Sequence, residues 1–478
     1  MEDYEVFVSF ITNVVFVTML GWYLITNLQW YDYKLSRVIL KHHKPQWHLI
    51  YFFIPFIAYH TTGQFFLIFF YFAILPALFI WNKKLDKKLV LTWRVKRFLI
   101  LLVSLTLFQD VLCSLKDGCS TYGVFMPLAM AYIGSHLIEK YLFMVYKKQA
   151  KQKLSDMKNL QIIAITGSYG KTSIKNFVAQ MLSKKYKVYA TPRSVNTLGG
   201  IIGDINNSLP TDTDIYICEA GAREIGDIYE ITTFVEPQTV VVGKVGEAHI
   251  EYFGSLKNII STKLEIMQSP RLQNAFIHTS VTTEPHEKVT FFGDGVSDLE
   301  ATLDGINFKL DGMKLHTDVL GAFQTMNIEV AVKIAKLFMI NDEEIITLVD
   351  RLKPIEHRLE LIKAGGKIIL DDGYNGNIDG MLEGIRLCSL HNGRKKVIVT
   401  PGLVESSEKL NLKLIDAINN TFDIVIVTGK LNAKLFDENL DVANKILLED
   451  KSALTSILAS HTKEGDIILF ANDAPNFI

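Results

Sequence analysis

The pattern of hydrophobic and polar positions divides the chain near residue 155. Before that point lie five long apolar runs, at about residues 6–28, 48–60, 64–81, 98–115 and 121–138. An apolar helix of about 20 residues crosses the roughly 30 Å of hydrocarbon in a bilayer. The sequence therefore predicts an α-helical multi-span membrane domain over residues 1–155, with about five transmembrane helices. The second run is short, and its alternative interpretations are a re-entrant segment and one half of a tight hairpin that turns at Thr61–Gly63.

Basic side chains gather in the connectors between these runs, at about residues 34–44, 83–97 and 140–153. Basic connectors stay on the cytoplasmic side of a membrane, so the pattern predicts an external N-terminus and an internal location for everything after residue 146. We therefore expect a multi-pass protein of the inner (cytoplasmic) membrane, with the lipid bilayer as a partner and the domains after residue 146 in the cytoplasm. The alternative is one anchor followed by buried helices of a soluble core.

After residue 155 short β-branched runs alternate with amphipathic stretches. The expected strands are at residues 161–166, 187–191, 215–219 and 239–245, and then at 367–370, 396–400, 423–428 and 466–470. Such alternation favours a mainly parallel sheet with helices on both faces. The sequence predicts an α/β fold with a central ATP-binding P-loop domain over 156–353 and a C-terminal Rossmann-like domain over 354–478.

Composition narrows the function classes. The chain of 478 residues has 50 Lys and Arg against 51 Asp and Glu. This balance gives no reason to expect nucleic acid as a partner. The 4 cysteines are scattered without a CxxC pair, a pattern typical of a reducing compartment rather than of a disulfide scaffold.

The most specific local feature is a short glycine-containing run between an apolar strand and a helix. Its residues are Thr166, Gly167, Ser168, Tyr169, Gly170, Lys171, Thr172 and Ser173. Backbone N–H groups and a helix N-terminus can hold phosphate oxygens there. Lys171 can reach the β- and γ-phosphates, and the Thr172 hydroxyl can bind Mg²⁺. The spacing is shorter than in the standard P-loop, because Ile165 stands where its first glycine would be. An ordinary strand–helix turn is the alternative.

Further motifs follow this loop in a fixed order. They are C-E-A-G at 218–221, G-E-A-H-I-E at 246–251 with F-G-S at 253–255, T-K-L-E at 262–265 and H-R-L-E at 357–360. Each has a plainer interpretation alone: Glu219 as a solvated carboxylate, His249 as a packed or surface histidine, and Lys263 as a helix-face lysine. Together with the loop, over about residues 160–478, they resemble the Mur ligase family of ATP-dependent amide-bond-forming enzymes.

The resemblance implies a role for each matching residue. ATP would contact the residues of the loop from Gly167 to Ser173, with Asn327 on the adenine side and Arg358 and Asp372 at the nucleotide. Thr172, Glu219 and His249 would bind Mg²⁺, and Lys263 corresponds to a lysine that is often carbamylated. The expected catalytic residues are Lys171, His249, Lys263 and Arg358. The sequence departs from the family at His357, where the family has glycine, and at Phe323 and Gln324.

Two motifs resemble one branch of the family. D-D-G-Y-N-G-N at 371–377 and N-D-A-P at 472–475 are similar to those of ligases that add D-alanyl-D-alanine to UDP-N-acetylmuramoyl-tripeptide through an acyl phosphate. The resemblance implies these two substrates, and cell-wall synthesis proteins as partners. The implied substrate-site residues are Thr191, Asn196, Tyr374, Asn375 and Asn377.

The first third of the chain departs from the family, whose members of this branch normally begin with a soluble domain that holds the UDP group. Two alternatives therefore stay open. One is a Mur-type ligase that acts on a lipid-linked or other acceptor. The other is a membrane transporter or sensor with a cytoplasmic ATPase. Few charges lie in the apolar runs, with Asp110 the main one, which disfavours a transport path.

Overall fold

The structure is a computed structural model, and it describes residues 2–40, 42–85, 87–115, 123–193, 195–246, 250–281, 287–374, 376–404 and 406–472. The side chains of residues 2–6, 251 and 252 are outside this description. The chain forms two compact units, Met1–Val145 and Tyr146–Ile478. Each unit is described by itself below.

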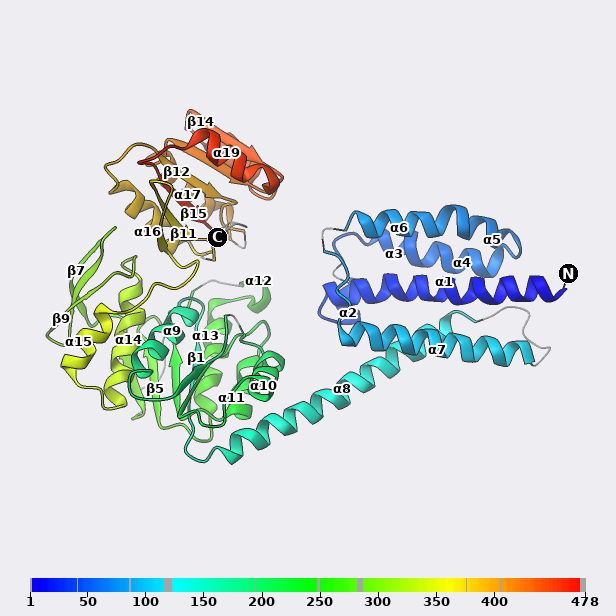
Figure 1. The fold of residues 1–478 in the computed structure, drawn as a ribbon, viewed down its shortest axis with the longest axis horizontal. Coiled ribbons are helices and arrows are strands. Elements are labelled where there is room, and N and C mark those ends of the chain that lie inside the picture. The colour runs from blue at the N-terminus through cyan, green and yellow to red at the C-terminus, as the bar shows by residue number, and fades with distance from the viewer. Residues whose placement is uncertain are drawn as a thin grey trace. The chain divides into compact units, whose positions relative to one another are not determined.

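The N-terminal unit is helical (Figure 1). Its elements are α1 (Glu2–Trp30), α2 (Leu35–Leu40), α3 (Gln46–His48), the π-helix η1 (Leu49–Phe53), α4 (Ile54–Thr61), α5 (Phe65–Phe69), the π-helix η2 (Phe70–Ile74), α6 (Leu75–Lys83), α7 (Trp93–Leu115) and the first part of α8 (Phe125–Asp156). Phe16 and Leu20 of α1 pack with Phe98 and Leu102 of α7. A Cβ atom on Gly21 would clash with Leu102, so the absence of a side chain there allows the two helices to approach closely.

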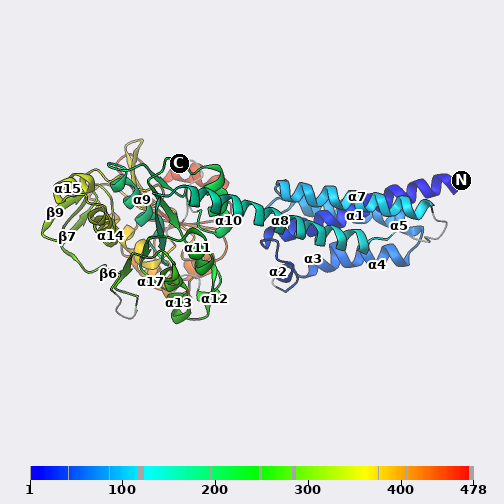
Figure 2. The ribbon, with the colours of Figure 1, turned by 90° about the horizontal axis from the view of Figure 1, so that it is seen from below.

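The part of the chain that the structure describes has fewer candidate membrane spans than the five predicted. Among the described residues, three helical stretches are long and apolar enough to cross a membrane by length and composition: Phe7–Trp30, Phe65–Lys83 and Trp93–Leu115. The run at 48–60 lies in the helical stretch formed by α3, η1 and α4, which ends at Thr61 and is shorter than these three. From Phe125 on, the run at 121–138 forms the start of α8, one continuous helix in both views (Figures 1 and 2), which acquires Glu139 and Lys140 before its apolar part is long enough.

The cysteines also differ from the predicted pattern. Cys113, near the end of α7, is disulfide-bonded, whereas Cys218 and Cys388 are free and buried. The pattern that favoured a reducing compartment therefore did not reveal the disulfide at Cys113.

The C-terminal unit begins with a parallel sheet in the order β2-β3-β1-β4-β5-β6. Its strands are β1 (Gln161–Thr166), β2 (Val188–Ala190), β3 (Ile215–Glu219), β4 (Thr239–Val242), β5 (Asn274–His278) and β6 (Val289–Phe292). The helices that follow these strands are α9 (Lys171–Leu182), α10 (Leu198–Asn207), α11 (Asp227–Val235), α12 (Ile250–Phe253) and α13 (Leu256–Leu264), with the 3₁₀ helix η3 (Glu265–Gln268). The central strand β1 pairs with β3 and β4, so its carboxyl end lies between theirs.

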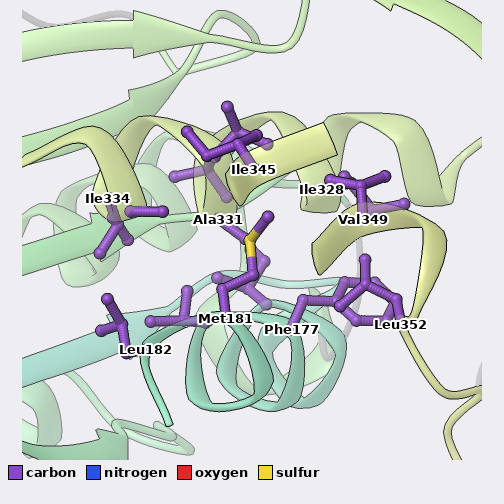
Figure 3. Packing of buried hydrophobic residues seen from close by; sticks show 14 of the residues in the cluster. Phe177, Met181, Leu182, Ile328, Ala331, Ile334, Ile345, Val349 and Leu352 are labelled. Atoms are coloured by element: carbon purple, nitrogen blue, oxygen red, sulfur yellow. The ribbon is translucent and has the colours of Figure 1, made fainter. Parts of the chain in front are cut away.

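Apolar side chains on one face of this sheet form a continuous core. Phe177 and Met181 of α9 face Ile328 and Ala331 of α14 (Gln324–Leu337), and α15 (Asp342–Asp350) adds Ile345 and Val349 (Figure 3). A small antiparallel sheet of β7 (Val296–Thr302), β8 (Gly305–Leu310) and β9 (Met313–Thr317) joins the same core. This packing fixes α9, and therefore the loop that precedes it, to the sheet.

The last sheet has the order β10-β11-β15-β12-β13-β14 and is parallel except for the β10–β11 pair. Its strands are β10 (Glu360–Ala364), β11 (Lys367–Asp372), β12 (Lys396–Thr400), β13 (Ile424–Thr428), β14 (Asn444–Leu448) and β15 (Ile467–Ala471). Its helices are α16 (Ile378–Ser389), α17 (Glu408–Asn419), α18 (Ala433–Asn439) and α19 (Leu454–His461), with the 3₁₀ helix η4 (Lys451–Ala453). The predicted α/β fold with parallel sheets is confirmed.

Candidate active site

The phosphate-loop candidate connects the carboxyl end of β1 to α9. Gly167 and Gly170 have φ values of 150° and 77°, which favour glycine because a side chain would be strained there. A Cβ on Gly170 would lie 2.5 Å from Asn327 Oδ1. The structure therefore brings the loop against the start of α14. The Asn327 side chain is held there because its Nδ2 atom donates to Gln324 Oε1 at 2.8 Å.

The loop is held by the segment that follows β4. The N–H groups of Ser168 and Tyr169 donate to the Lys244 carbonyl at 3.0 and 3.1 Å, and Ser168 Oγ donates to the Gly246 carbonyl at 3.1 Å. Thr172 and Ser173 lie in the first turn of α9. This is the strand–loop–helix arrangement in which a helix N-terminus receives an anion.

Three charged side chains converge on the loop. Lys171 Nζ donates to the Gly167 carbonyl at 2.8 Å. Burial lowers the pKa of Lys171, the Glu219 carboxylate opposes that shift, and the Arg358 guanidinium adds to it. Lys171, Glu219 and Arg358 therefore lie within electrostatic range of one another, although they are far apart in the sequence.

Glu219 ends β3 and is 1% exposed. Its Oε1 atom lies 2.8 Å from Lys175 Nζ but has no hydrogen-bond partner among the described residues. Two of the three ammonium hydrogens of Lys175 go to the carbonyls of Thr191 and Arg193, since Nζ donates to each at 2.6 Å. The Glu219 carboxylate is thus buried and charge-paired, and a carboxylate oxygen is a ligand that suits Mg²⁺.

Sequence reasoning missed Lys175. The residue lies one helical turn after Lys171, on the face of α9 that carries Ile174, Phe177 and Val178. A lysine on such a face is buried only when it has partners, so its position on an otherwise apolar face was a usable signal.

Lys263 lies in α13 and is 5% exposed. Burial and the nearby charge of Lys171 lower its pKa to about 7, against the opposing effects of Asp227 and Glu265. Lys263 therefore belongs to the same site as the phosphate loop, and its amine titrates near neutrality.

Arg358 precedes β10, beside the loop that follows β11. Its Nη1 atom donates to the Tyr374 carbonyl at 2.5 Å. Burial lowers the pKa of Arg358, while Asp372, Glu219 and Tyr374 raise it. Asp372 is buried at the end of β11, and Tyr374 is exposed. Asn377 caps α16 by accepting from the Gly380 N–H at 2.9 Å, which makes it a structural residue here.

The proposed substrate residues after β2 lie next to Glu219. Thr191 is buried, and its Oγ1 atom accepts from the Glu219 N–H at 3.4 Å. The Asn196 carbonyl accepts from the Gly221 N–H at 2.8 Å, and a Cβ on Gly221 would lie 2.9 Å from Asn196 Cγ. The structure therefore places the predicted substrate residues Thr191 and Asn196 beside the carboxyl end of β3.

Two predicted residues, His249 and Asn375, lie outside the described residues. Among those that are described, no group of three or more His, Cys, Asp or Glu side chains could hold a metal. The implied Mg²⁺ set, Thr172, Glu219 and His249, includes only one described carboxylate.

Contacts from α16 connect the last sheet to the first. Lys244 Nζ lies 2.8 Å from Asp379 Oδ2, and the Ala322 N–H donates to Glu383 Oε1 at 2.8 Å. Arg386 donates from Nη2 to the Ala301 carbonyl at 2.9 Å. Lys244 is the residue whose carbonyl holds the phosphate loop, so this contact links the loop to the last domain.

Comparison with known proteins agrees with this geometry. Residues 165–335 match the Mur ligase middle domain. The UDP-N-acetylmuramoyl-tripeptide–D-alanyl-D-alanine ligase of Bacillus subtilis is 28% identical over 345 residues, which cover 67% of this chain and 74% of that protein. The same ligase of Borreliella burgdorferi is 26% identical over 310 residues, with 60% of this chain and 65% of that protein covered.

Solved structures show the same fold. MurF ligase from Thermotoga maritima in complex with ADP aligns with a TM-score of 0.58 and 24% identity, covering 69% of this chain and 80% of that chain. MurF from Acinetobacter baumannii aligns with a TM-score of 0.60 and 21% identity, covering 69% and 77%.

These findings correct one expectation and confirm another. The predicted multi-pass location in the inner membrane is contradicted, because the MurF ligases that the chain resembles are soluble cytoplasmic enzymes, and the apolar helices meet criteria of length and composition only. The predicted family is confirmed by the middle domain and by the MurF relatives, whose match is longer than this domain. The chain therefore contains the middle domain of the Mur ligases, a family of ATP-dependent amide-bond ligases.

Proposed function

We propose that this chain joins the carboxylate of UDP-N-acetylmuramoyl-tripeptide to the amine of D-alanyl-D-alanine, with ATP and Mg²⁺. The observation that carries the proposal is the convergence of Lys171, Glu219, Lys263 and Arg358 on one glycine-containing loop. The names of the relatives supply the substrates.

The reaction has two steps. The substrate carboxylate attacks the γ-phosphorus of ATP, ADP leaves, and an acyl phosphate forms. The amine then attacks the acyl carbon, inorganic phosphate leaves, and the amine loses a proton. Lys171 and Arg358 are placed to stabilise the negative charge that develops on the transferred phosphoryl group.

Thr172 and Glu219, with His249 outside the described residues, would hold Mg²⁺. The ion would neutralise phosphate charge when it is bound. The buried Glu219 carboxylate and the Thr172 hydroxyl fit this role, since Mg²⁺ prefers oxygen ligands. Thr191 and Asn196 lie beside Glu219 and would line the acyl-substrate site, and Tyr374 and Asn375 would meet the incoming dipeptide. Contacts of α16 with Lys244 and Ala322 would keep the last domain over the nucleotide.

The direct test is product analysis. The purified full chain is incubated with ATP, Mg²⁺, UDP-N-acetylmuramoyl-tripeptide and D-alanyl-D-alanine, and the mixture is analysed by mass spectrometry. We expect a UDP-muramoyl product heavier than the substrate by the dipeptide less one water, with one ADP per product. Intact ATP binding without this product would reject these substrates and point to another acceptor.

Lys263 provides a second test. An amine combines with CO₂ only in its neutral form, and a pKa of about 7 means that the neutral fraction rises from roughly one tenth at pH 6 to roughly nine tenths at pH 8. Activity of the wild type should therefore depend on bicarbonate and increase across this range. Lys263→Ala should lose activity, and bicarbonate should not restore it.

The matched control is Lys257→Ala, because Lys257 is an exposed residue of the same helix. It should keep both the activity and the response to bicarbonate. A fully active Lys263→Ala enzyme would show that the reaction does not need a carbamate on Lys263.

A further inference from the structure

His357, the residue before Arg358, stands where the family has glycine, and its side chain makes contacts that a glycine could not make. His357 has φ of 60° and Leu359 has φ of 56°, so Arg358 stands between two left-handed residues that are not glycine. Such a conformation is unfavourable for ordinary side chains and persists where the surroundings enforce it. Something must therefore hold this segment in place.

The His357 ring supplies that hold. Its Nδ1 atom lies 2.6 Å from Asp371 Oδ2, and both residues are buried, with exposed fractions of 7% and 0%. Asp371 is the first residue of the D-D-G-Y-N-G-N motif, at the end of β11. The ring thus joins the segment that carries Arg358 to the strand that carries Asp372.

The same pair shapes the turn on which Arg358 rests. Asp371 Oδ1 accepts from the Gly373 N–H at 3.0 Å, and the His357 carbonyl accepts from the Tyr374 N–H at 3.2 Å. The His357 and Tyr374 rings meet edge to face, with centroids 4.5 Å apart. Arg358 Nη1 in turn donates to the Tyr374 carbonyl. These contacts form a closed ring from His357 through Asp371 and Tyr374 to Arg358.

We propose that His357 is a positioning residue of the active site, which uses its contact with Asp371 to fix the Arg358 guanidinium toward the nucleotide phosphates. The proposal rests on the proposed function for the role of Arg358. Glycine in the same place would tolerate the backbone but offer no ring contact. In this chain, the position of Arg358 therefore depends on a side chain.

His357→Gly and His357→Asn test the proposal, because glycine and asparagine both tolerate a positive φ. Steady-state kinetics and the affinity for Mg²⁺-ATP, measured by equilibrium dialysis, are determined for each folded variant. We expect His357→Gly to bind Mg²⁺-ATP about 10-fold more weakly or to lose about 10-fold in kcat/KM for ATP. His357→Asn keeps a donor for Asp371 and should recover part of that loss.

The binding measurement separates the two proposals. It needs no acceptor substrate, so it stays informative if the wild type binds ATP but makes no product with D-alanyl-D-alanine. A purely structural role would lower the melting temperature and leave the affinity and kcat/KM of the folded protein unchanged in both variants. That result would overturn the inference. If His357→Gly does not fold, wild-type values for His357→Asp, which places a carboxylate against Asp371, would overturn it equally.

Discussion

Replacing Lys171 with alanine should reduce ATP-dependent ligation by about 10²–10³-fold or more, the usual cost of removing one preorganised donor from a developing charge. The ammonium group lies at the phosphate loop, with Glu219 and Arg358 within electrostatic range, and no other lysine takes this place in α9. Its partners in this structure are loop carbonyls, which a bound phosphate would replace. Product formation per unit time, at saturating substrates, is the measurement.

Lys184→Ala is the matched control, because Lys184 is an exposed lysine after the end of the same helix. It should retain wild-type turnover. Circular dichroism and thermal unfolding should be nearly unchanged in both variants, since the half-buried Lys171 side chain bonds only to carbonyls of the loop. Near-normal turnover of Lys171→Ala would refute the role assigned to the loop.

Replacing Lys175 with methionine should destabilise the C-terminal unit by about 3–5 kcal/mol, the cost of leaving a buried carboxylate without its partner. Lys175 and Glu219 have side-chain exposures of 2% and 1%, so water cannot take over from the ammonium group. The carbonyls of Thr191 and Arg193 lose their donor as well. The measurement is the denaturant midpoint of the full chain, followed by a probe of the C-terminal unit.

A double-mutant cycle identifies the cause. Glu219→Gln removes the buried charge, so adding it to Lys175→Met should recover part of the lost stability. Lys184→Met, at an exposed position, should change stability by no more than about 0.5 kcal/mol. If Lys175→Met unfolds at the wild-type midpoint, the buried pair does not stabilise this sheet.

Periodicity located the elements that are buried on both faces. The strand expected at 161–166 is β1, and the helix expected after the loop is α9. Strands of a buried parallel sheet have nearly continuous apolar sequences, so β3, β4 and β12 could be predicted from the sequence. The small sheet was not predicted, because β7 is largely exposed and carries polar side chains such as Ser297, Asp298 and Glu300.

The length of the apolar runs was not enough to predict the helices of the first third of the chain. Hydropathy cannot show where a helix ends, so it did not reveal that the helical stretch 46–61 stops at Thr61, short of the length of a span. It also cannot show that the run after residue 124 continues as α8 into a charged helix. The number of long apolar helices could therefore be determined only from the structure. The predicted membrane location was corrected only by the comparison with relatives.

The candidate site was predictable where a motif carried it. Lys171, Glu219, Lys263 and Arg358 were named from their motifs, and the structure brings them together. Lys175 and the His357–Asp371 contact were not named, because each depends on a partner far away in the sequence. The glycine that the family has at position 357 indicated a positive φ there. The sequence does not reveal which contact stabilises that backbone conformation when the residue is histidine.

The central claim is that this site couples ATP cleavage to the joining of two substrates. Phosphate release from the full chain with ATP and Mg²⁺ tests it most directly, with UDP-N-acetylmuramoyl-tripeptide and D-alanyl-D-alanine supplied together, singly and not at all. We predict sustained release only with both substrates present, at one phosphate per product, and release slowed by about 10²-fold or more in Lys171→Ala. Sustained release that is indifferent to both substrates would identify an uncoupled ATPase and contradict the account.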